Sequence, residues 1–182
     1  AGKVFKWKFQ SHWPAASASF KPLKNFFDTT LTKLTEGRLQ IALHPAGALT
    51  PANAIFDSCK QGMIDGGTAS PIYWMGIIPI TAVASNCPMT FRAAWEGLYF
   101  HYLMGFEDMM KEAHLKHNIL YYTEKIYPTA MISKKPVRTV EDFKGMKIRS
   151  SGAIAEFLKD LGAATSIIPG PELYLALQTG VI

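Results

Sequence analysis

Apolar and polar residues alternate in the segment VFKWKFQ, residues 4–10, which is the pattern of a half-buried strand. From Ser19 to Glu36 the apolar residues instead recur at helical spacing, and Gly37 follows as a glycine that ends a helix. The segment LQIALHP, residues 39–45, is the next predicted strand. The sequence therefore begins with the order strand, helix, strand, which favours a parallel α/β arrangement.

The middle of the sequence continues with shorter patterns. Residues 51–62 predict a helix that has Pro51 in its first turn and Gly62 at its end, and residues 63–70 predict a strand followed by a loop. Further elements are expected as follows: a buried strand in residues 79–88, one long helix in 91–114, one or two strands in 118–133, and a helical turn in 139–145 capped by Thr139.

The order strand, helix, strand, helix returns near the end of the sequence. The segments that carry it are MKIRSSG (146–152), AIAEFLKDLG (153–162), TSIIP (165–169) and PELYLALQTG (171–180). This repetition predicts an α/β protein of two similar lobes, which we place at residues 1–126 and 127–182.

Two apolar residues, Val181 and Ile182, follow directly after the glycine that ends the last helix. Another strand is expected at this point, so we expect the second lobe to be incomplete in this chain. Ligands of parallel sheets bind beyond the carboxyl ends of the strands. Two lobes that face each other would enclose a cleft there, and we expect the ligand in it.

Composition narrows the classes of function. The chain has 182 residues, of which 48% are hydrophobic, and a formal net charge of +5. Lys and Arg are spread along the sequence without a long run, which argues against a nucleic-acid groove and favours attraction of small anions or of a negative surface. The longest apolar stretch, residues 73–87, is too short to span a membrane and contains Pro79. Cys59 and Cys87 are either two small core residues or one disulfide.

Arg149 is the strongest candidate for binding. It ends a predicted strand, and Ser150, Ser151 and Gly152 then open a helix whose first N–H groups attract anions, with Ser151 as its expected N-cap. A guanidinium grips a carboxylate through two parallel hydrogen bonds. The alternative is a surface arginine that pairs with a nearby acidic residue, for which the candidates are Glu141, Asp142 and Glu156.

Aromatic and polar residues after other predicted strands form a second set of candidates. Tyr73 can donate a hydrogen bond to a ligand, and Trp74 can wall its apolar part. Core packing is the alternative for both residues, and for Trp74 it is favoured over a role in binding. His12 follows the first strand, where a solvated loop histidine is the alternative. Tyr127 and Thr129 lie in an extended segment that we expect to cross between the lobes.

Patterns of catalysis and of metal binding are absent from the sequence. It contains no G-x-S-x-G, H-E-x-x-H, P-loop or G-x-G-x-x-G motif, and His101, His114 and His117 are too scattered for a metal site. A binding protein is therefore favoured over an α/β enzyme that acts on an anionic substrate.

Two segments resemble the solute-binding proteins of TRAP transporters, the DctP family. They are PVRTVEDFKGMKIR, residues 136–149, and PGPELYLALQTGVI, residues 169–182. Residues 44–67 resemble the first-lobe segment of the same family. The resemblance runs in the same order along essentially the whole chain.

The resemblance implies a two-lobed periplasmic binding protein fold of a type II-like class, which closes around a small organic acid in the interlobe cleft. It implies an extracytoplasmic location after removal of a signal peptide, and delivery of the acid to a membrane permease. The family's carboxylate-binding arginine falls on Arg149. The segments around His12 and Tyr73 resemble the branch that binds 2-oxo and 2-hydroxy monocarboxylates.

One position departs from that branch. The resemblance places an amide side chain, which helps to hold a metal ion, 21 residues before Arg149, and this chain has Pro128 there. This departure argues against a bound metal ion beside the ligand, although the alternative stays open, as do sulfonates or larger carboxylates as ligands. A homodimer and a ligand-sensor domain of the same fold also stay open.

Overall fold

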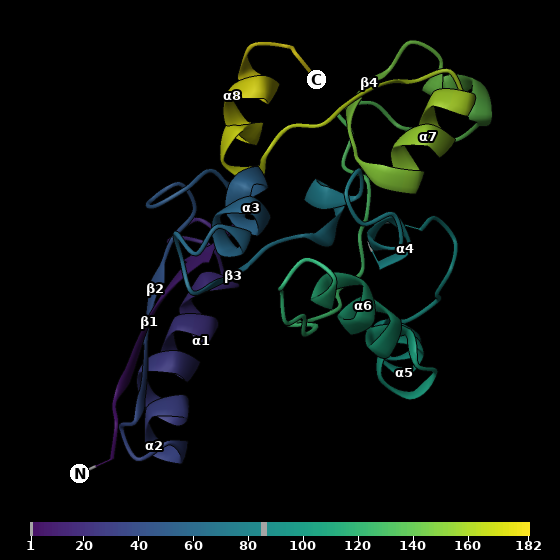
Figure 1. Cartoon of the computed structure of the whole chain (residues 1–182). Helices are drawn as coiled ribbons and strands as arrows, with labels where there is room; N and C mark the ends of the chain where they lie inside the picture. The colour runs from purple at the N-terminus through teal and green to yellow at the C-terminus, as the bar shows by residue number, and fades with distance from the viewer. Residues whose placement is uncertain (1, 85–86) are drawn as a thin grey trace. The chain divides into compact units, whose positions relative to one another are not determined.

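The computed structural model describes residues 2–84 and 87–182. Two compact units make up the chain, Ala1–Tyr73 with Pro169–Pro171, and Trp74–Ile168 with Glu172–Ile182. Each unit holds its own parallel sheet (Figure 1). Within the described residues, no helix is long and apolar enough to cross a membrane. The predicted lobe boundary between residues 126 and 127 stays a prediction.

The sheet of the first unit has the strand order β2-β1-β3, with β1 (Phe5–Ser11) in the centre. Strand β2 (Leu39–His44) runs parallel to it and pairs from Phe5 with Leu39 to Gln10 with His44. The third strand, β3 (Gly66–Thr68), is also parallel and pairs with the end of β1. The strands predicted at residues 4–10, 39–45 and 63–70 are therefore confirmed, as is their parallel direction.

The predicted helix between Ser19 and Glu36 is confirmed, but its middle is wound more loosely. It consists of α1 (Phe20–Asn25), a π-helix (Phe26–Leu31) and α2 (Thr32–Leu34). The hydroxyl of Thr32 donates to the carbonyl of Phe27, five residues earlier, at 3.0 Å. The segment is thus one continuous helical rod with a π-helical insertion.

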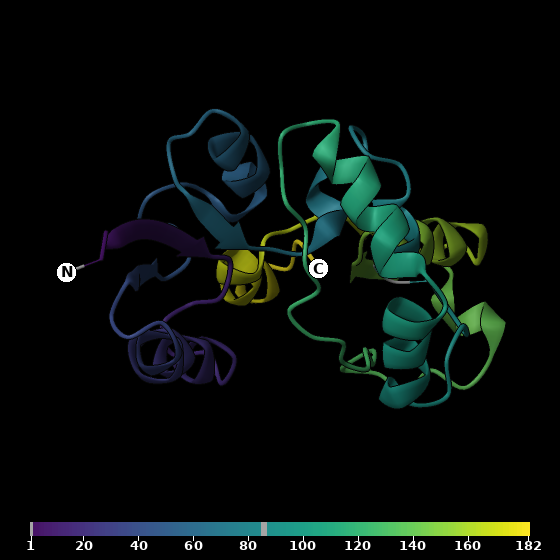
Figure 2. The ribbon, with the colours of Figure 1, turned by 60° about the horizontal axis from the view of Figure 1, so that its bottom comes forward.

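The second helix of this unit is α3 (Ile55–Lys60), which follows a 3-10 helix (Ala52–Ala54). Figure 2 shows α1 and α3 on opposite sides of the three-stranded sheet. Both helices bury apolar side chains against it, and the buried set includes Phe20, Ile41, Leu43, Ile55, Phe56 and Ile64. This core holds the carboxyl ends of β1 and β3 in place.

The second unit begins with helices where the sequence predicted a strand. A 3-10 helix (Pro71–Trp74) joins the two units, and α4 (Thr81–Ala84) lies within residues 79–88. The predicted buried strand is therefore wrong for residues 81–84, while residues 85–86 lie outside the described residues. A short apolar run suits a buried helical turn as well as a strand, and here the N–H of Ala82 bonds the carbonyl of Pro79 at 3.0 Å.

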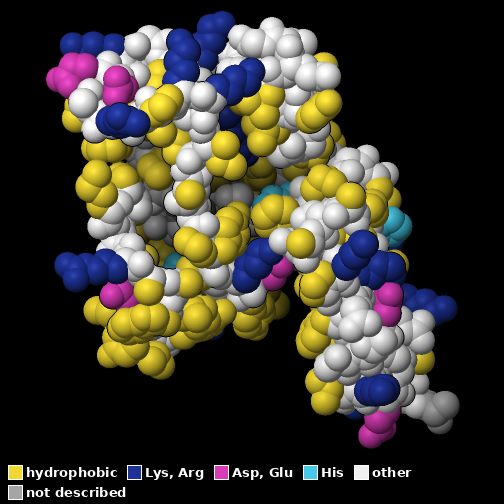
Figure 3. Space-filling model, turned by 180° about the vertical axis from the view of Figure 1, so that it is seen from behind, with side chains coloured by type: hydrophobic (Ala, Val, Ile, Leu, Met, Phe, Trp, Pro, Cys, Tyr) yellow, Lys and Arg dark blue, Asp and Glu magenta, His cyan; other side chains and the backbone are white. Residues whose placement is uncertain are grey.

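Residues 91–114 form two helices, not the single helix that was predicted. They are α5 (Ala94–Leu103) and α6 (Phe106–Leu115), and Gly105 between them has φ of 80°. Only glycine adopts this left-handed conformation without strain, so the chain changes direction at Gly105. Large apolar side chains gather on the exposed face of α5 (Figure 3), among them Trp95, Tyr99 and Leu103.

The strands predicted in residues 118–133 are also wrong. Residues 119–133 run without helix or strand, because no strand of either described sheet pairs with them. A strand needs a partner for its backbone groups, and sequence alternation alone does not supply one. The next element, a 3-10 helix (Val140–Phe143), has the predicted cap, since Thr139 and Asp142 form a reciprocal capping box.

The repeat near the end of the sequence is confirmed in its topology. Strands β4 (Lys147–Arg149) and β5 (Ala164–Ser166) are parallel, and α7 (Gly152–Asp160) connects them. A 3-10 helix (Gly170–Glu172) and α8 (Leu173–Gln178) follow.

Both cysteines are free. The disulfide alternative for Cys59 and Cys87 therefore does not hold in this structure. Burial, and to a smaller extent the nearby carboxylate of Asp65, raises the pKa of the Cys59 thiol to about 11.

Candidate functional site

Arg149 is the last residue of β4 and lies opposite Ser166 in the parallel register. Its side chain is exposed, and its Nε donates a hydrogen bond to the carbonyl of Ile168 at 2.9 Å. This bond fixes the guanidinium at the carboxyl end of the two-stranded sheet, which is the edge where ligands of parallel sheets bind.

Two of the three acidic residues that were the alternative partners of Arg149 are engaged elsewhere. Glu156 pairs with Lys159 at 2.8 Å, and Asp142 accepts hydrogen bonds from the backbone N–H groups of Arg138 and Thr139. These backbone donors, above all that of Arg138, lower the pKa of Asp142. Among the described residues Arg149 itself forms no ion pair, so its positive charge is available to an anion from outside the chain.

The start of α7 adds to the positive character of this edge. Ser151 is the N-cap residue, as predicted, although its side chain does not cap the helix. The first turn of α7 carries no acidic residue that would offset the partial positive charge of its N–H groups. Ser150 and Ser151 are both buried, and the N–H of Ser150 donates to the carbonyl of Ser166 at 3.0 Å.

A second group of predicted residues lies at the carboxyl ends of β1 and β3 in the first unit. The rings of His12 and Tyr73 meet edge to face, with centroids 6.5 Å apart, so the structure brings these two candidates together. The backbone N–H of His12 donates to the carbonyl of Thr68 at 2.9 Å, and the hydroxyls of Ser11 and Thr68 are 3.3 Å apart. Sequence reasoning missed Ser11 and Thr68, although both are polar residues at strand ends.

Trp74 lies in the interior of the second unit. Its indole Nε1 donates a hydrogen bond to Nε2 of His114, on α6, at 2.8 Å. Sequence reasoning considered His114 only as a possible metal ligand and missed this contact. The signal was the helical spacing of Phe106, Met110 and His114, which are all buried and share one face of α6.

Tyr127, Pro128 and Thr129 are exposed in the irregular segment between α6 and β4. The ammonium of Lys125 lies 5.5 Å from the centre of the Tyr127 ring, in a cation–π arrangement. Their contact with a ligand stays a prediction.

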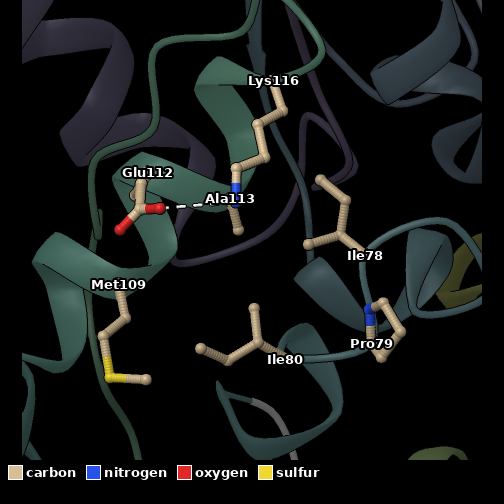
Figure 4. Close-up of a pocket in the computed structure, with 7 residues that line it drawn as sticks. All are labelled: Ile78, Pro79, Ile80, Met109, Glu112, Ala113 and Lys116. Carbon is tan, nitrogen blue, oxygen red and sulfur yellow. Dashed lines mark ion pairs between the residues drawn. The ribbon is translucent and has the colours of Figure 1, made fainter.

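A pocket of about 330 Å³ opens in the second unit, and none of the predicted site residues lines it (Figure 4). It is lined by Ile78, Pro79, Ile80, Met109, Glu112, Ala113 and Lys116. Lys116 and Glu112 form an ion pair at 3.3 Å, so the one cation of this pocket is already neutralised. Over the described part of the chain, no three His, Cys, Asp or Glu residues are grouped to hold a metal ion.

The sequence pattern of the bacterial extracellular solute-binding protein family 7 (DctP) matches residues 9–182. This chain belongs to that family. The family and the two-lobed α/β binding-protein fold that the sequence predicted are therefore confirmed.

The relatives of this DctP-family chain include proteins named for 2-oxo acids or solved with bound pyruvate. It is 26% identical over 179 residues to the monocarboxylate 2-oxoacid-binding periplasmic protein of Nostoc sp. strain PCC 7120, a match that covers 97% of this chain and 49% of that protein. A TRAP periplasmic solute binding protein of Pseudoalteromonas atlantica T6c, with bound sodium and pyruvate, superimposes with a TM-score of 0.83 at 28% identity, covering 99% of this chain and 55% of that one.

A second solved structure, from Colwellia psychrerythraea with bound calcium and pyruvate, gives a TM-score of 0.82 at 27% identity over the same shares, 99% and 55%. The DctP-family chain described here spans about half the length of the relatives it matches.

Proposed function

We propose that this protein is the extracytoplasmic solute-binding protein of a TRAP transporter and that it captures a small organic acid, a 2-oxo or 2-hydroxy carboxylate, for delivery to a membrane permease. The observation that carries the proposal is Arg149 at the carboxyl end of β4, next to a helix start without acidic residues. The matched family consists of extracellular solute-binding proteins, which supports a binding role over a catalytic one.

In this proposal Arg149 is the anchor of the ligand carboxylate. The Nε bond to Ile168 orients the guanidinium, and its terminal N–H groups then donate to the two carboxylate oxygens. Charge-assisted hydrogen bonds of this kind contribute about 1.5–3 kcal/mol each. The N–H groups at the start of α7 and the hydroxyl of Ser151 add favourable donors for a negative ligand.

The remaining candidates select the rest of the ligand. Tyr73 donates a hydrogen bond to the oxo or hydroxy oxygen, and His12, which meets its ring, limits the space beside it. We propose that Trp74, Tyr127 and Thr129 contribute the remaining contacts with the ligand. Binding energy from several elements then favours a closed form of the protein over an open one.

A metal ion beside the ligand does not fit the residues of this chain well. Solved relatives carry sodium or calcium together with pyruvate. Here Pro128 stands where the related branch has an amide, and it offers no side-chain oxygen. In the proposed complex Arg149 is therefore the only cation that compensates the negative charge of the ligand carboxylate.

The proposal is tested by calorimetric titration of the purified protein with pyruvate, lactate and larger 2-oxo acids. Pyruvamide, which has the same size as pyruvate but no negative charge, is the matched control. We expect saturable binding of at least one acid and binding of the amide that is weaker by about 30-fold or more, equivalent to about 2 kcal/mol. Equal binding of acid and amide, or turnover of any acid into a product, would contradict the proposal.

A further inference from the structure

His114 on α6 is fully buried and makes hydrogen bonds through both ring nitrogens. Its Nε2 lies 2.8 Å from Nε1 of Trp74, and its Nδ1 lies 2.7 Å from the carbonyl oxygen of Met110. An indole N–H can only donate, so Nε2 must accept and carries no proton. The proton is therefore on Nδ1, which donates to Met110, and the neutral tautomer of His114 is fixed.

The surroundings of His114 also favour the neutral ring. The ring of Tyr121 stacks on it with centroids 4.5 Å apart, and the ring of Trp74 meets it at 90°. Burial lowers the pKa of His114, the hydrogen bond to Met110 opposes this, and the nearby charge of His117 lowers it further. Tyr121 stays neutral at physiological pH, since burial raises the pKa of its hydroxyl.

Trp74 is held at its backbone as well as at its side chain. It is the last residue of the 3-10 helix Pro71–Trp74, and its carbonyl accepts hydrogen bonds from the N–H groups of Ile77 and Ile78, both at 2.9 Å. The preceding residue in the same helical turn is Tyr73, the proposed hydrogen-bond donor to the ligand. Tyr73 and Trp74 therefore belong to one helical turn and are joined by a single peptide bond.

We infer that His114 is a positioning residue for ligand binding: it fixes the indole of Trp74 and thereby the turn that presents Tyr73. This inference rests on the proposed function. His114 does not touch the ligand in this account, and its contribution depends on accepting one hydrogen bond.

A dependence on pH follows from the geometry. When His114 gains a proton on Nε2, two N–H groups face each other and the bond to Trp74 is lost. The affinity for the ligand should therefore be highest at pH values above the ordinary pKa of histidine, where His114 is neutral. It should fall as the pH drops through the lowered pKa of His114.

Three substitutions separate the two hydrogen bonds of His114. His114→Gln places an amide oxygen where Nε2 lies in histidine. It therefore keeps an acceptor for Trp74 but has no titratable group. His114→Asn is shorter, so it reaches Met110 but not Trp74. Trp74→Phe removes the donor and keeps the aromatic ring.

The measurement is calorimetric affinity for pyruvate, or for the acid that binds best, between pH 5 and pH 8. At pH 7.5 we expect His114→Gln to bind within about 2-fold of the wild type, and His114→Asn and Trp74→Phe to bind about 3- to 10-fold more weakly, since one neutral hydrogen bond is at stake. The wild type should lose affinity toward pH 5, and all three variants should lose less. Thermal unfolding of each variant confirms that it is folded.

A second readout does not need a ligand. The chain has four tryptophans, and Trp74→Phe assigns the indole N–H resonance of Trp74 in a nitrogen-15 NMR spectrum. This resonance should shift with pH in the wild type and should not shift in His114→Gln.

The outcomes are distinguishable. If the wild type binds the acid but all variants bind equally well at every pH, the role of His114 is overturned and the proposed function stands. A Trp74 resonance that is insensitive to pH also overturns it. If no acid binds the wild type, the proposed function fails and the positioning role fails with it, even where the NMR titration shows the Trp74–His114 bond.

Discussion

Strands β1 and β2 pair over six residues, whereas β4 and β5, which occupy the same places in the repeated order, pair over three. The interiors differ as well. Around the first pair, large side chains are buried: Leu43 is 6% exposed and Phe56 is 4% exposed. Around the second pair the buried apolar residues are alanines, and large side chains such as Leu175 stay 62% exposed.

This difference shows that one order of elements can be built with very different amounts of core. The parallel topology depends on strand patterns, on a connecting helix and on glycines that end it, and both copies have these features. Stability depends on large buried side chains, which only the first copy has among its described residues. The arginine proposed to bind the ligand thus belongs to the copy with the smaller core.

The largest expected effect tests this contrast with one chemical change made at two places. Leu43→Ala removes a buried side chain from β2 and should lower the free energy of unfolding by about 2–5 kcal/mol. Leu175→Ala, in α8, removes an exposed one and should change it by no more than about 0.5 kcal/mol. Urea denaturation followed by circular dichroism measures both.

Similar losses at the two positions would mean that Leu175 is covered in solution, and the contrast between the two cores would then be wrong. Leu49→Ala is a further control within the first unit, because Leu49 is 44% exposed and should behave like Leu175.

A smaller effect compares the glycines that end the connecting helices. Gly37 and Gly162 have φ of 74° and 90°, so alanine at either position adopts a left-handed conformation that costs about 1–2 kcal/mol. A methyl group at Gly37 meets nothing within 4 Å, whereas at Gly162 it lies 3.1 Å from Cγ and 3.4 Å from Cα of Lys144. Gly162→Ala should therefore be the more destabilising of the two substitutions.

The same denaturation experiment checks this order. The carbonyl of Gly162 accepts a hydrogen bond from the N–H of Gly145 at 2.9 Å, which limits how far the neighbouring Lys144 backbone can move away. A larger loss in Gly37→Ala than in Gly162→Ala would show that the second copy adapts more easily than its contacts suggest.

Local patterns were sufficient to predict most of the elements. The alternation in VFKWKFQ, the helical spacing before Gly37 and the proline and glycine signals of the later helices all correspond to elements of the structure. The failures are segments whose state depends on distant partners. Residues 119–133 alternate like a strand but no described strand pairs with them, and the break at Gly105 depends on a backbone angle that spacing alone does not reveal.

The candidate site was also predicted only in part, because sequence patterns reveal local features and not contacts between distant residues. Arg149 at a strand end and Ser151 at the N-cap of α7 are consequences of local order, and the structure has both. The contact between His12 and Tyr73 joins residues 61 positions apart, and that between Trp74 and His114 joins residues 40 apart. Contacts between residues so far apart in the sequence depend on tertiary packing, which sequence patterns alone do not reveal.

The most direct test of the account is the calorimetric affinity of Arg149→Ala for the acid that the wild type binds best. The matched control is Arg38→Ala, because Arg38 is also exposed and its Nε also donates to a backbone carbonyl, that of Thr35 at 3.3 Å, but it precedes a strand and does not end one. We expect Arg149→Ala to lose about 2–5 kcal/mol of binding free energy and Arg38→Ala to bind like the wild type. Unchanged affinity in a folded Arg149→Ala protein would contradict the central claim that this arginine binds the carboxylate.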